Sequence, residues 1–187
     1  MTSIRNQRDS VFYKLKSHQS FAKVLLLCTA TALLSHCNYA VNLNNKTVYT
    51  PPSIFKNYQI ADQSLHNCVE QTLFDKHITR AEDLTVLNCS NAGIKSLAGV
   101  DTFFALKELN LAENQISDIS AIGKLGQLTK LILRKNALTE TEPLLHLLHL
   151  TDLDVSENPI SQCKNLAQLK NNYDGKKLNL TLPTSCI

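Results

Sequence analysis

The six cysteines are the residues of this 187-residue chain whose possible chemistry is easiest to state. They lie at Cys28, Cys37, Cys68, Cys89, Cys163 and Cys186. A cysteine thiol can join a disulfide, bind a metal ion, accept a lipid or stay free. No C-x-x-C motif accompanies them, which disfavours zinc ligation. The last four form two pairs of similar separation, and these are either two disulfides or two pairs of buried free thiols.

Other reactive residue types form no pattern typical of an enzyme. His146 and His149 are three positions apart in "PLLHLLHL", but they stand among leucines of an apolar pattern and are disfavoured as metal ligands. No Ser/His/Asp or Cys/His set has a plausible spacing, and a chain with so few glycines has no glycine-rich phosphate loop. We therefore expect no catalysis, no cofactor and no bound metal ion.

The N-terminal segment 1–37 is typical of an export signal. Its apolar run at 24–34, "VLLLCTATALL", follows a basic stretch. The run is too short to span a bilayer, which takes about 20 residues, and it matches the apolar region of a signal peptide. The alternative is a buried core helix.

Two processing routes are possible for that signal. "LLSHC" resembles a bacterial lipobox and would place a lipid on Cys37, whereas plain cleavage would follow Ala40. Because Asn38 is not an inner-membrane retention aspartate, a lipidated form is expected at the outer membrane. Without the lipid the chain would be periplasmic or secreted.

The composition of the remaining chain limits its partners. Residues 38–187 carry 14 Lys and Arg against 15 Asp and Glu, a net charge of −1, so nothing indicates nucleic-acid binding. Residues 38–57 lack hydrophobic periodicity, are rich in Asn and contain a Pro-Pro pair. This composition predicts a flexible tether between a membrane and a folded domain.

From residue 84 the sequence repeats with a period of 22. Each unit begins with leucine, at Leu84, Leu106, Leu128 and Leu150. The next inward positions are Leu87, Leu109, Leu131 and Leu153, and then Cys89, Leu111, Leu133 and Val155. An asparagine follows at Asn114, Asn136 and Asn158, with Ala92 in the first unit. The step of two between the second and third apolar positions indicates a short strand and argues against amphipathic helices.

This pattern is the leucine-rich-repeat signature. It predicts an α/β-type repeat solenoid, a right-handed coil with a four-stranded parallel sheet on its concave face. The units are 84–105, 106–127, 128–149 and 150–171, between an N-terminal helical cap at 58–83 and a C-terminal cap at 172–187. The chain turns sharply where each strand ends, and we expect the amides of Asn114, Asn136 and Asn158 to form a structural ladder that satisfies the freed backbone groups.

The repeat also explains the thiols. Cys89 takes the place of a core leucine in the first coil and follows Cys68 by nearly one repeat period. Cys163, in the last coil, precedes Cys186 by a similar interval. Neighbouring coils lie about 4.8 Å apart, within the range that a disulfide bridges. We therefore expect Cys68–Cys89 and Cys163–Cys186 disulfides that fix each end coil to its cap. Disulfides imply an oxidising compartment, in agreement with the export signal.

Over about residues 60–170 the motifs resemble internalin-type, SDS22-like bacterial leucine-rich-repeat proteins. They are the cap "IADQSLHNCVEQTLFDKHITRAED" and the coils "NCSNAGIKSLAGV" and "NLAENQISDISAI". The resemblance implies a non-enzymatic surface or secreted binding module. The cysteine-stapled form suggests a Gram-negative envelope protein.

The concave face is the expected binding surface. Its candidate partner-binding residues are Glu108, Asn110, Lys130, Ile132, Arg134, Asp152 and Asp154. Glu108, Lys130 and Asp152 should form a row of alternating charge across the strands. That row is either a self-compensating surface ladder or a charged stripe for a protein ligand. We expect a monomeric protein-interaction module; the alternatives are a structural or scaffolding envelope lipoprotein and a secreted effector that acts on host proteins.

Overall fold

The computed structural model describes residues 41–43, 46–49, 54–173 and 177–187, with side chains from residue 54 onward. The chain divides into two compact units, residues 1–51 and residues 52–187. The predicted export signal and its Cys28 and Cys37 lie outside the described residues. No helix in the described ranges is long and apolar enough to cross a membrane.

In the first unit, an antiparallel hairpin joins β1 (Val41–Leu43) to β2 (Lys46–Tyr49). The tether predicted over 38–57 therefore contains regular structure. Valine, threonine and tyrosine favour extended pairing, a local preference that a search for longer periodicity does not detect. The end of the predicted tether also differs, because Ile54 and Phe55 pack against the hydrophobic core of the second unit.

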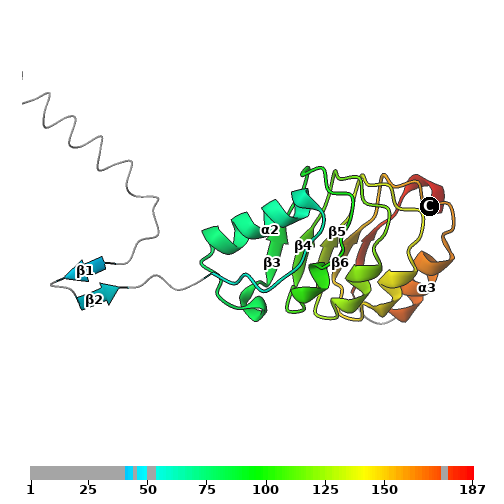
Figure 1. Ribbon diagram of the computed structural model, residues 1–187. Coiled ribbons are helices and arrows are strands. Elements are labelled where there is room, and N and C mark those ends of the chain that lie inside the picture. The colour runs from blue at the N-terminus through cyan, green and yellow to red at the C-terminus, as the bar shows by residue number, and fades with distance from the viewer. Residues whose placement is uncertain (1–40, 44–45, 50–53, 174–176) are drawn as a thin grey trace, which may run out of the picture. The chain divides into compact units, whose positions relative to one another are not determined.

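The second unit is a stack of coils around one parallel sheet (Figure 1). Its strands are β3 (Val86–Asn88), β4 (Glu108–Asn110), β5 (Lys130–Ile132), β6 (Asp152–Asp154) and β7 (Asn179–Thr181), paired in that order. The strands of the repeats pair in the register that the repeat period requires, with Leu87, Leu109, Leu131 and Leu153 side by side. The leucine-rich-repeat solenoid predicted from the sequence is confirmed.

The sheet has one strand more than the sequence predicted. β7 lies in the segment expected to be only a C-terminal cap, and it pairs with β6 through Leu153 and Leu180. Residues 179–181 carry no repeat consensus, so periodicity alone could not identify them. The strand forms because the parallel edge of β6 offers partners for its backbone groups.

The side of each coil opposite the sheet is built from short 3₁₀ helices and, in the last coil, an α-helix. The 3₁₀ helices of the repeats are Val100–Thr102, Ser120–Lys124 and Glu142–His146; two more, Ala81–Asp83 and Thr184–Cys186, precede β3 and follow β7. The α-helix α3 (Lys164–Asn172) buries Leu166 and Leu169. Its neighbour Tyr173 accepts a hydrogen bond from the Leu150 N–H and donates one to the Leu147 carbonyl, each 2.7 Å long.

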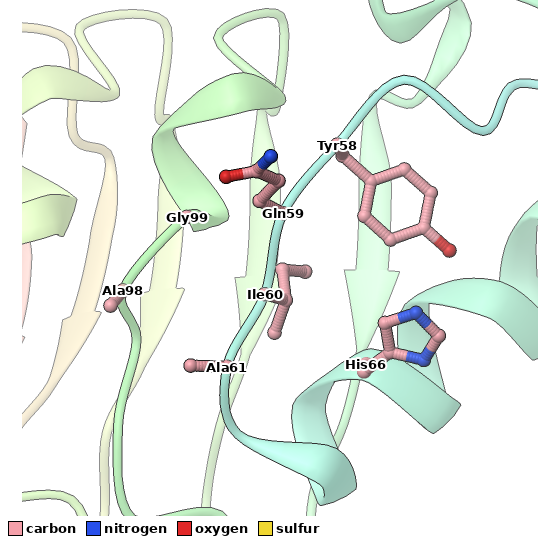
Figure 2. A pocket seen from close by; sticks show the side chains of 7 residues that line it. All are labelled: Tyr58, Gln59, Ile60, Ala61, His66, Ala98 and Gly99. Atoms are coloured by element: carbon pink, nitrogen blue, oxygen red, sulfur yellow. The ribbon is translucent and has the colours of Figure 1, made fainter.

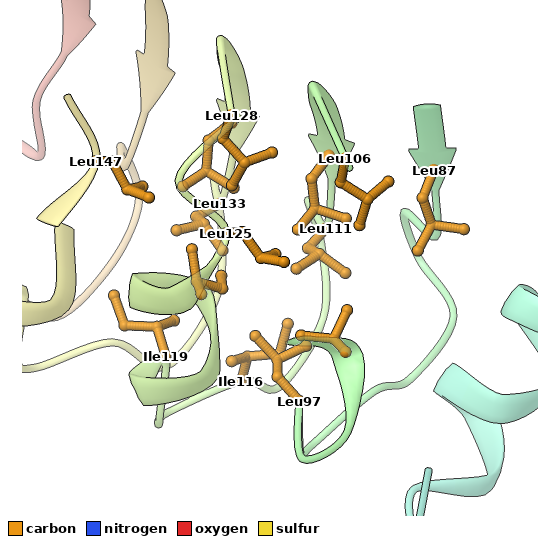
Figure 3. Packing of buried hydrophobic residues seen from close by; sticks show 14 of the residues in the cluster. Leu87, Leu97, Leu106, Leu111, Ile116, Ile119, Leu125, Leu128, Leu133 and Leu147 are labelled. Carbon is orange, nitrogen blue, oxygen red and sulfur yellow. The ribbon is translucent and has the colours of Figure 1, made fainter. Parts of the chain in front are cut away.

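Leucine and isoleucine side chains of successive coils stack into one continuous core (Figure 3). Leu106, Leu128 and Leu133 are fully buried, as are Ile116 and Ile122. Burying one such side chain contributes about 1.5–3 kcal/mol, and only the neighbouring coil can supply the contact. The stack therefore folds as a unit and needs a cover at each end.

The helix α2 (Gln63–Asp75) covers the N-terminal end. Leu65, Val69 and Leu73 recur at every fourth position, so they share one helix face, and all three are fully buried. The Cys68–Cys89 disulfide ties α2 to the first coil with a Cα separation of 5.8 Å. The Cys163–Cys186 disulfide fixes the other end with a Cα separation of 5.4 Å. Both predicted disulfides are present, and a loop of this length is worth about 3 kcal/mol in the chain-entropy model.

Asp62 joins the cap to the first coil through both carboxylate oxygens. Oδ1 accepts from the Leu65 N–H at 3.0 Å and caps α2. Oδ2 accepts from the N–H groups of Lys95 and Ser96 at 2.8 and 3.0 Å. Burial by itself would raise the pKa of Asp62, but these backbone donors outweigh it and hold that pKa below its usual range.

Acid should therefore weaken the cap. Because the folded-state pKa of Asp62 is depressed, its contribution to stability is fully present above its unfolded pKa of about 3.9. It is lost as the pH falls through the lower folded value. In Asp62→Asn we expect a loss of about 1–2 kcal/mol at neutral pH and a smaller further loss on acidification below the unfolded pKa than in the unchanged protein. Urea denaturation at each pH measures both, with the exposed Asp75→Asn as control. An equally steep acid loss in Asp62→Asn would contradict the assignment.

A second prediction concerns Thr141, which occupies an apolar position of the repeat with 1% of its surface exposed. Its Oγ1 is buried and has no hydrogen-bond partner among the residues that the structure describes. Thr141→Val replaces that hydroxyl with a methyl of the same shape, so we expect unfolding to cost about 1 kcal/mol more. Thr129→Val is the control, because the Thr129 hydroxyl does donate, to the Lys107 carbonyl, and its loss should not stabilise. Thermal unfolding of both variants decides the point, and a destabilised Thr141→Val would refute it.

Candidate functional site

The turn at the end of each strand fixes where outward-facing side chains can stand. Asn91, Glu113, Lys135 and Glu157 recur once per coil, and all adopt positive φ, between 53° and 59°. A left-handed conformation costs an L-residue roughly 1–2 kcal/mol. The fold accepts this cost in every coil because the chain must turn away abruptly where the strand ends.

The asparagine that follows each such turn bonds across two coils. Asn114 Nδ2 donates to the carbonyls of Leu111 in its own coil and Cys89 in the preceding one, both at 2.9 Å. Its Oδ1 accepts from the Ile94 N–H at 3.0 Å. Asn136 and Asn158 repeat the arrangement one and two coils later. The amides thus join the coils as predicted, and the first unit has Ala92 at this place because no coil precedes it.

The face of the sheet that points away from the core, the concave face of the sequence analysis, carries two rows of side chains. The first row is Val86, Glu108, Lys130, Asp152 and Asn179, and the second is Asn88, Asn110, Ile132, Asp154 and Thr181. All seven candidate binding residues lie in these rows except Arg134, which stands two positions past Ile132.

Among the described residues of the first row, only the side chains at its C-terminal end, Asp152 and Asn179, form hydrogen bonds. Asp152 accepts from Asn179 Nδ2 at 2.9 Å and from the Thr151 hydroxyl at 2.8 Å. These two bonds, with the positive charges of Lys130 and Lys177, lower the pKa of Asp152. Glu108 and Lys130 are exposed and form no ion pair with any residue that the structure describes. The charge of Lys130 does act on Asp152, but neither Glu108 nor Lys130 is held by a direct contact to a described residue, so both side chains can turn toward a ligand.

In the second row, polar side chains accept hydrogen bonds from the backbone of the turn that follows their own strand. Asn110 Oδ1 accepts from the Ala112 N–H at 3.0 Å, and Asp154 Oδ1 accepts from the N–H and hydroxyl of Ser156 at 3.0 and 2.6 Å. Such bonds to the residue two places on are Asx turns, which stabilise the chain reversal. Ile132 interrupts the row with a partly buried apolar side chain. Asn110 and Asp154 thus have a structural role on the face that was expected to bind.

Arg134 forms ion pairs with Glu113 and Glu157, which were not among the candidate binding residues. Its two terminal nitrogens bind Glu157 at 2.9 Å and Glu113 at 3.0 Å, and Lys135 Nζ lies 3.3 Å from Glu113. The hydrogen bond and charge of Glu157 raise the pKa of Arg134, and Lys135 followed by Arg134 lowers the pKa of Glu113. No sequence signal indicated this cluster, because the turns that bring Glu113 and Glu157 to Arg134 are seen only in the folded chain. The guanidinium of Arg134 is therefore already occupied, in contrast to the ammonium of Lys130.

No three His, Cys, Asp or Glu side chains of residues 54–173 and 177–187 gather closely enough to hold a metal ion. His146 lies beside Glu142, with 3.6 Å between Nε2 and Oε1, on the side of the coil away from the sheet.

Two solved structures show what this architecture resembles. The internalin InlF of Listeria monocytogenes aligns with a TM-score of 0.58 and 29% sequence identity over 66% of this chain and 37% of that chain. Internalin C2 of the same organism aligns with a TM-score of 0.55 and 23% identity over 65% of this chain and 55% of that chain. The chain therefore spans less than two thirds of either structure. The resemblance inferred from the motifs is confirmed.

No protein-family model matches the chain, and no curated protein matches it in sequence.

Proposed function

We propose that this internalin-type leucine-rich-repeat protein is an exported protein-interaction module that binds a protein ligand through the concave face of its sheet. The observation that carries the proposal is the pair Glu108 and Lys130 at the centre of that face, which no described residue ties in an ion pair. Asp152, Asp154 and Arg134, the other charged candidates there, are already bonded to neighbours. A partner therefore meets one acidic and one basic side chain that stand opposite each other on adjacent strands.

The apolar side chains next to this pair support the same interpretation. Val86 is 38% exposed at the start of the charged row. Ile132 lies in the second row, on the same strand as Lys130. Apolar side chains form the core of a typical protein interface and polar groups its rim, so Val86 and Ile132 offer an apolar contact beside the charged pair. Five strands at about 4.8 Å cover less than the roughly 800 Å² that each side of a standard interface buries, so the partner must also reach the edges or the cap.

Export is proposed on two independent grounds. Residues 1–37 have the composition of an export signal, and the two disulfides are expected to form only in an oxidising compartment. Cys37 would carry the lipid in an envelope lipoprotein at the outer membrane; without it the protein is periplasmic or secreted.

Two other functions are kept as candidates. A scaffolding lipoprotein with no tight partner is the second, favoured by the extent of internal bonding on the concave face. A secreted effector that acts on host proteins is the third. In all three the chain is a monomer without nucleic-acid contacts.

Charge reversal tests the concave face. A partner is first captured on the immobilised protein from the envelope fraction of its host and purified, and its affinity is then measured. Lys130→Glu should weaken that affinity at least tenfold, because it removes an attraction and adds a repulsion in a desolvated interface. Arg134→Glu should change stability as well, since it breaks two ion pairs. Lys164→Glu, on α3, is the control and should bind normally. Equal affinity of Lys130→Glu and the unchanged protein would exclude the concave face.

The intact mass of the protein from its host, measured without reduction, tests export. We expect a chain that begins at Cys37, is heavier by a diacylglycerol and is lighter by four protons, as two disulfides require. A mass that begins after Ala40 with the same loss of four protons would move the protein to the periplasm or the medium. A full-length mass with free thiols would contradict export and favour the effector.

A further inference from the structure

The segment before α2 is clamped against the first coil. We call residues 54–61 the strap. Its Phe55 N–H donates to the Ile78 carbonyl at 2.9 Å, and the rings of Phe55 and Tyr58 lie 6.1 and 5.5 Å from the ring of Phe103. Asp62 anchors its end through the bonds to Lys95 and Ser96. The strap is therefore held in place against the first coil by contacts at both of its ends.

Gly99 shows how closely the strap approaches. This residue has a φ of 94°, and a Cβ placed on it would lie 1.9 Å from the carbonyl oxygen of Gln59. No other residue type fits that space, and no other adopts this φ without strain. The distance between the strap and the loop at Ala98 and Gly99 is thus set by backbone contact.

A shallow cavity of about 460 Å³, largely open to solvent, lies over the strap. Ala98 and Gly99 lie on one side of the strap, and the rings of Tyr58 and His66 lie on the other (Figure 2). The remaining lining residues are Gln59, Ile60 and Ala61 of the strap itself. None of these residues belongs to a strand, so the cavity is separate from the concave face.

Two aromatic rings form one wall of this cavity. The centroids of Tyr58 and His66 are 5.6 Å apart and their planes are inclined by 37°. The two rings therefore present neighbouring π faces rather than a closed stack. A flat cationic group is attracted to such faces.

Glu70 supplies a negative charge beside the rings. It lies one turn along α2 from His66, its side chain is 63% exposed, and its Oε2 is 4.0 Å from His66 Nδ1, too far for a hydrogen bond. Nδ1 is buried and has no hydrogen-bond partner in the described part of the chain. Glu70 is not one of the residues that line the cavity, but its charge adds to burial in raising the pKa of the Tyr58 phenol, so the carboxylate lies near this wall.

The strap also has free backbone groups. Ile60 and Ala61 form no backbone hydrogen bond with any residue in the described part of the chain. An extended peptide laid across the strap would find donors and acceptors there, as peptides do along exposed strand edges.

We propose that this cavity binds an arginine side chain of an extended segment in a protein partner. The guanidinium lies over the rings of Tyr58 and His66 and pairs with Glu70, while the adjoining peptide bonds to the strap. Arginine fits better than lysine because its planar group stacks on rings and is more weakly hydrated. An acidic side chain is repelled by Glu70, and an aliphatic one leaves that carboxylate unpaired. The proposal does not depend on whether the concave face binds.

The test is a titration of the full chain, with its disulfides intact, followed by the aromatic NMR signals of Tyr58 and His66. The probe is N-acetyl-arginine methylamide, and the comparison probes are the lysine, glutamate and leucine analogues. We expect saturable shifts at both rings with arginine, weaker ones with lysine, and none with glutamate or leucine. Equal response to arginine and leucine, or no saturation with arginine, would overturn the proposal.

Variants assign the binding to named groups. Glu70→Gln should weaken arginine binding about three- to fivefold, the size of one exposed ion pair. Glu140→Gln, an exposed glutamate on the third coil, is the matched control and should bind normally. Tyr58→Phe keeps the ring and should stay within about twofold of the unchanged protein. If Glu70→Gln binds arginine as well as Glu140→Gln does, the carboxylate has no part in the site and the proposal fails.

Discussion

The sharp turn that ends each strand is the constraint on which the rest of this structure depends. It places one residue of every coil at positive φ and leaves backbone groups without partners inside a leucine core. Asn114, Asn136 and Asn158 satisfy those groups, because one amide bonds to carbonyls of two coils and accepts an N–H as well. Each of these amides therefore also fixes neighbouring coils in register. The strands of the sheet are aligned by the bonds at the turns as well as by the hydrogen bonds between the strands.

The first and last coils are joined to the elements that cover them by bonds other than the asparagine amides. The first coil has no predecessor to bond with, so the amide is replaced by Ala92 and the connection is a disulfide from Cys89 to α2. Asp62 adds a second connection, because one carboxylate oxygen caps α2 while the other accepts two N–H groups of the first coil. At the other end α3, β7 and the second disulfide close the core. Thr141, with its unpaired hydroxyl, shows that the interior is not optimised at every position.

These structural demands restrict what the concave face can offer a partner. Asn110 and Asp154 complete Asx turns, and Arg134 is held by two glutamates. Few groups remain for recognition, chiefly Glu108 and Lys130. Aromatic side chains, which are enriched in many interfaces, gather instead near the strap and the first coil.

The sequence by itself determined the repeat, its strands, the asparagine positions and the pairing of four cysteines, because each follows from a period of 22 and from contacts between adjacent coils. Only the tertiary structure decided the rest. β7 has no consensus and forms because β6 offers an open edge. The ion pairs of Arg134 depend on side chains one coil away on either side, and the cavity over the strap depends on the close approach of Gln59 to Gly99, far apart in the chain. Such contacts join positions that no local pattern relates, so they become visible only when the chain is folded.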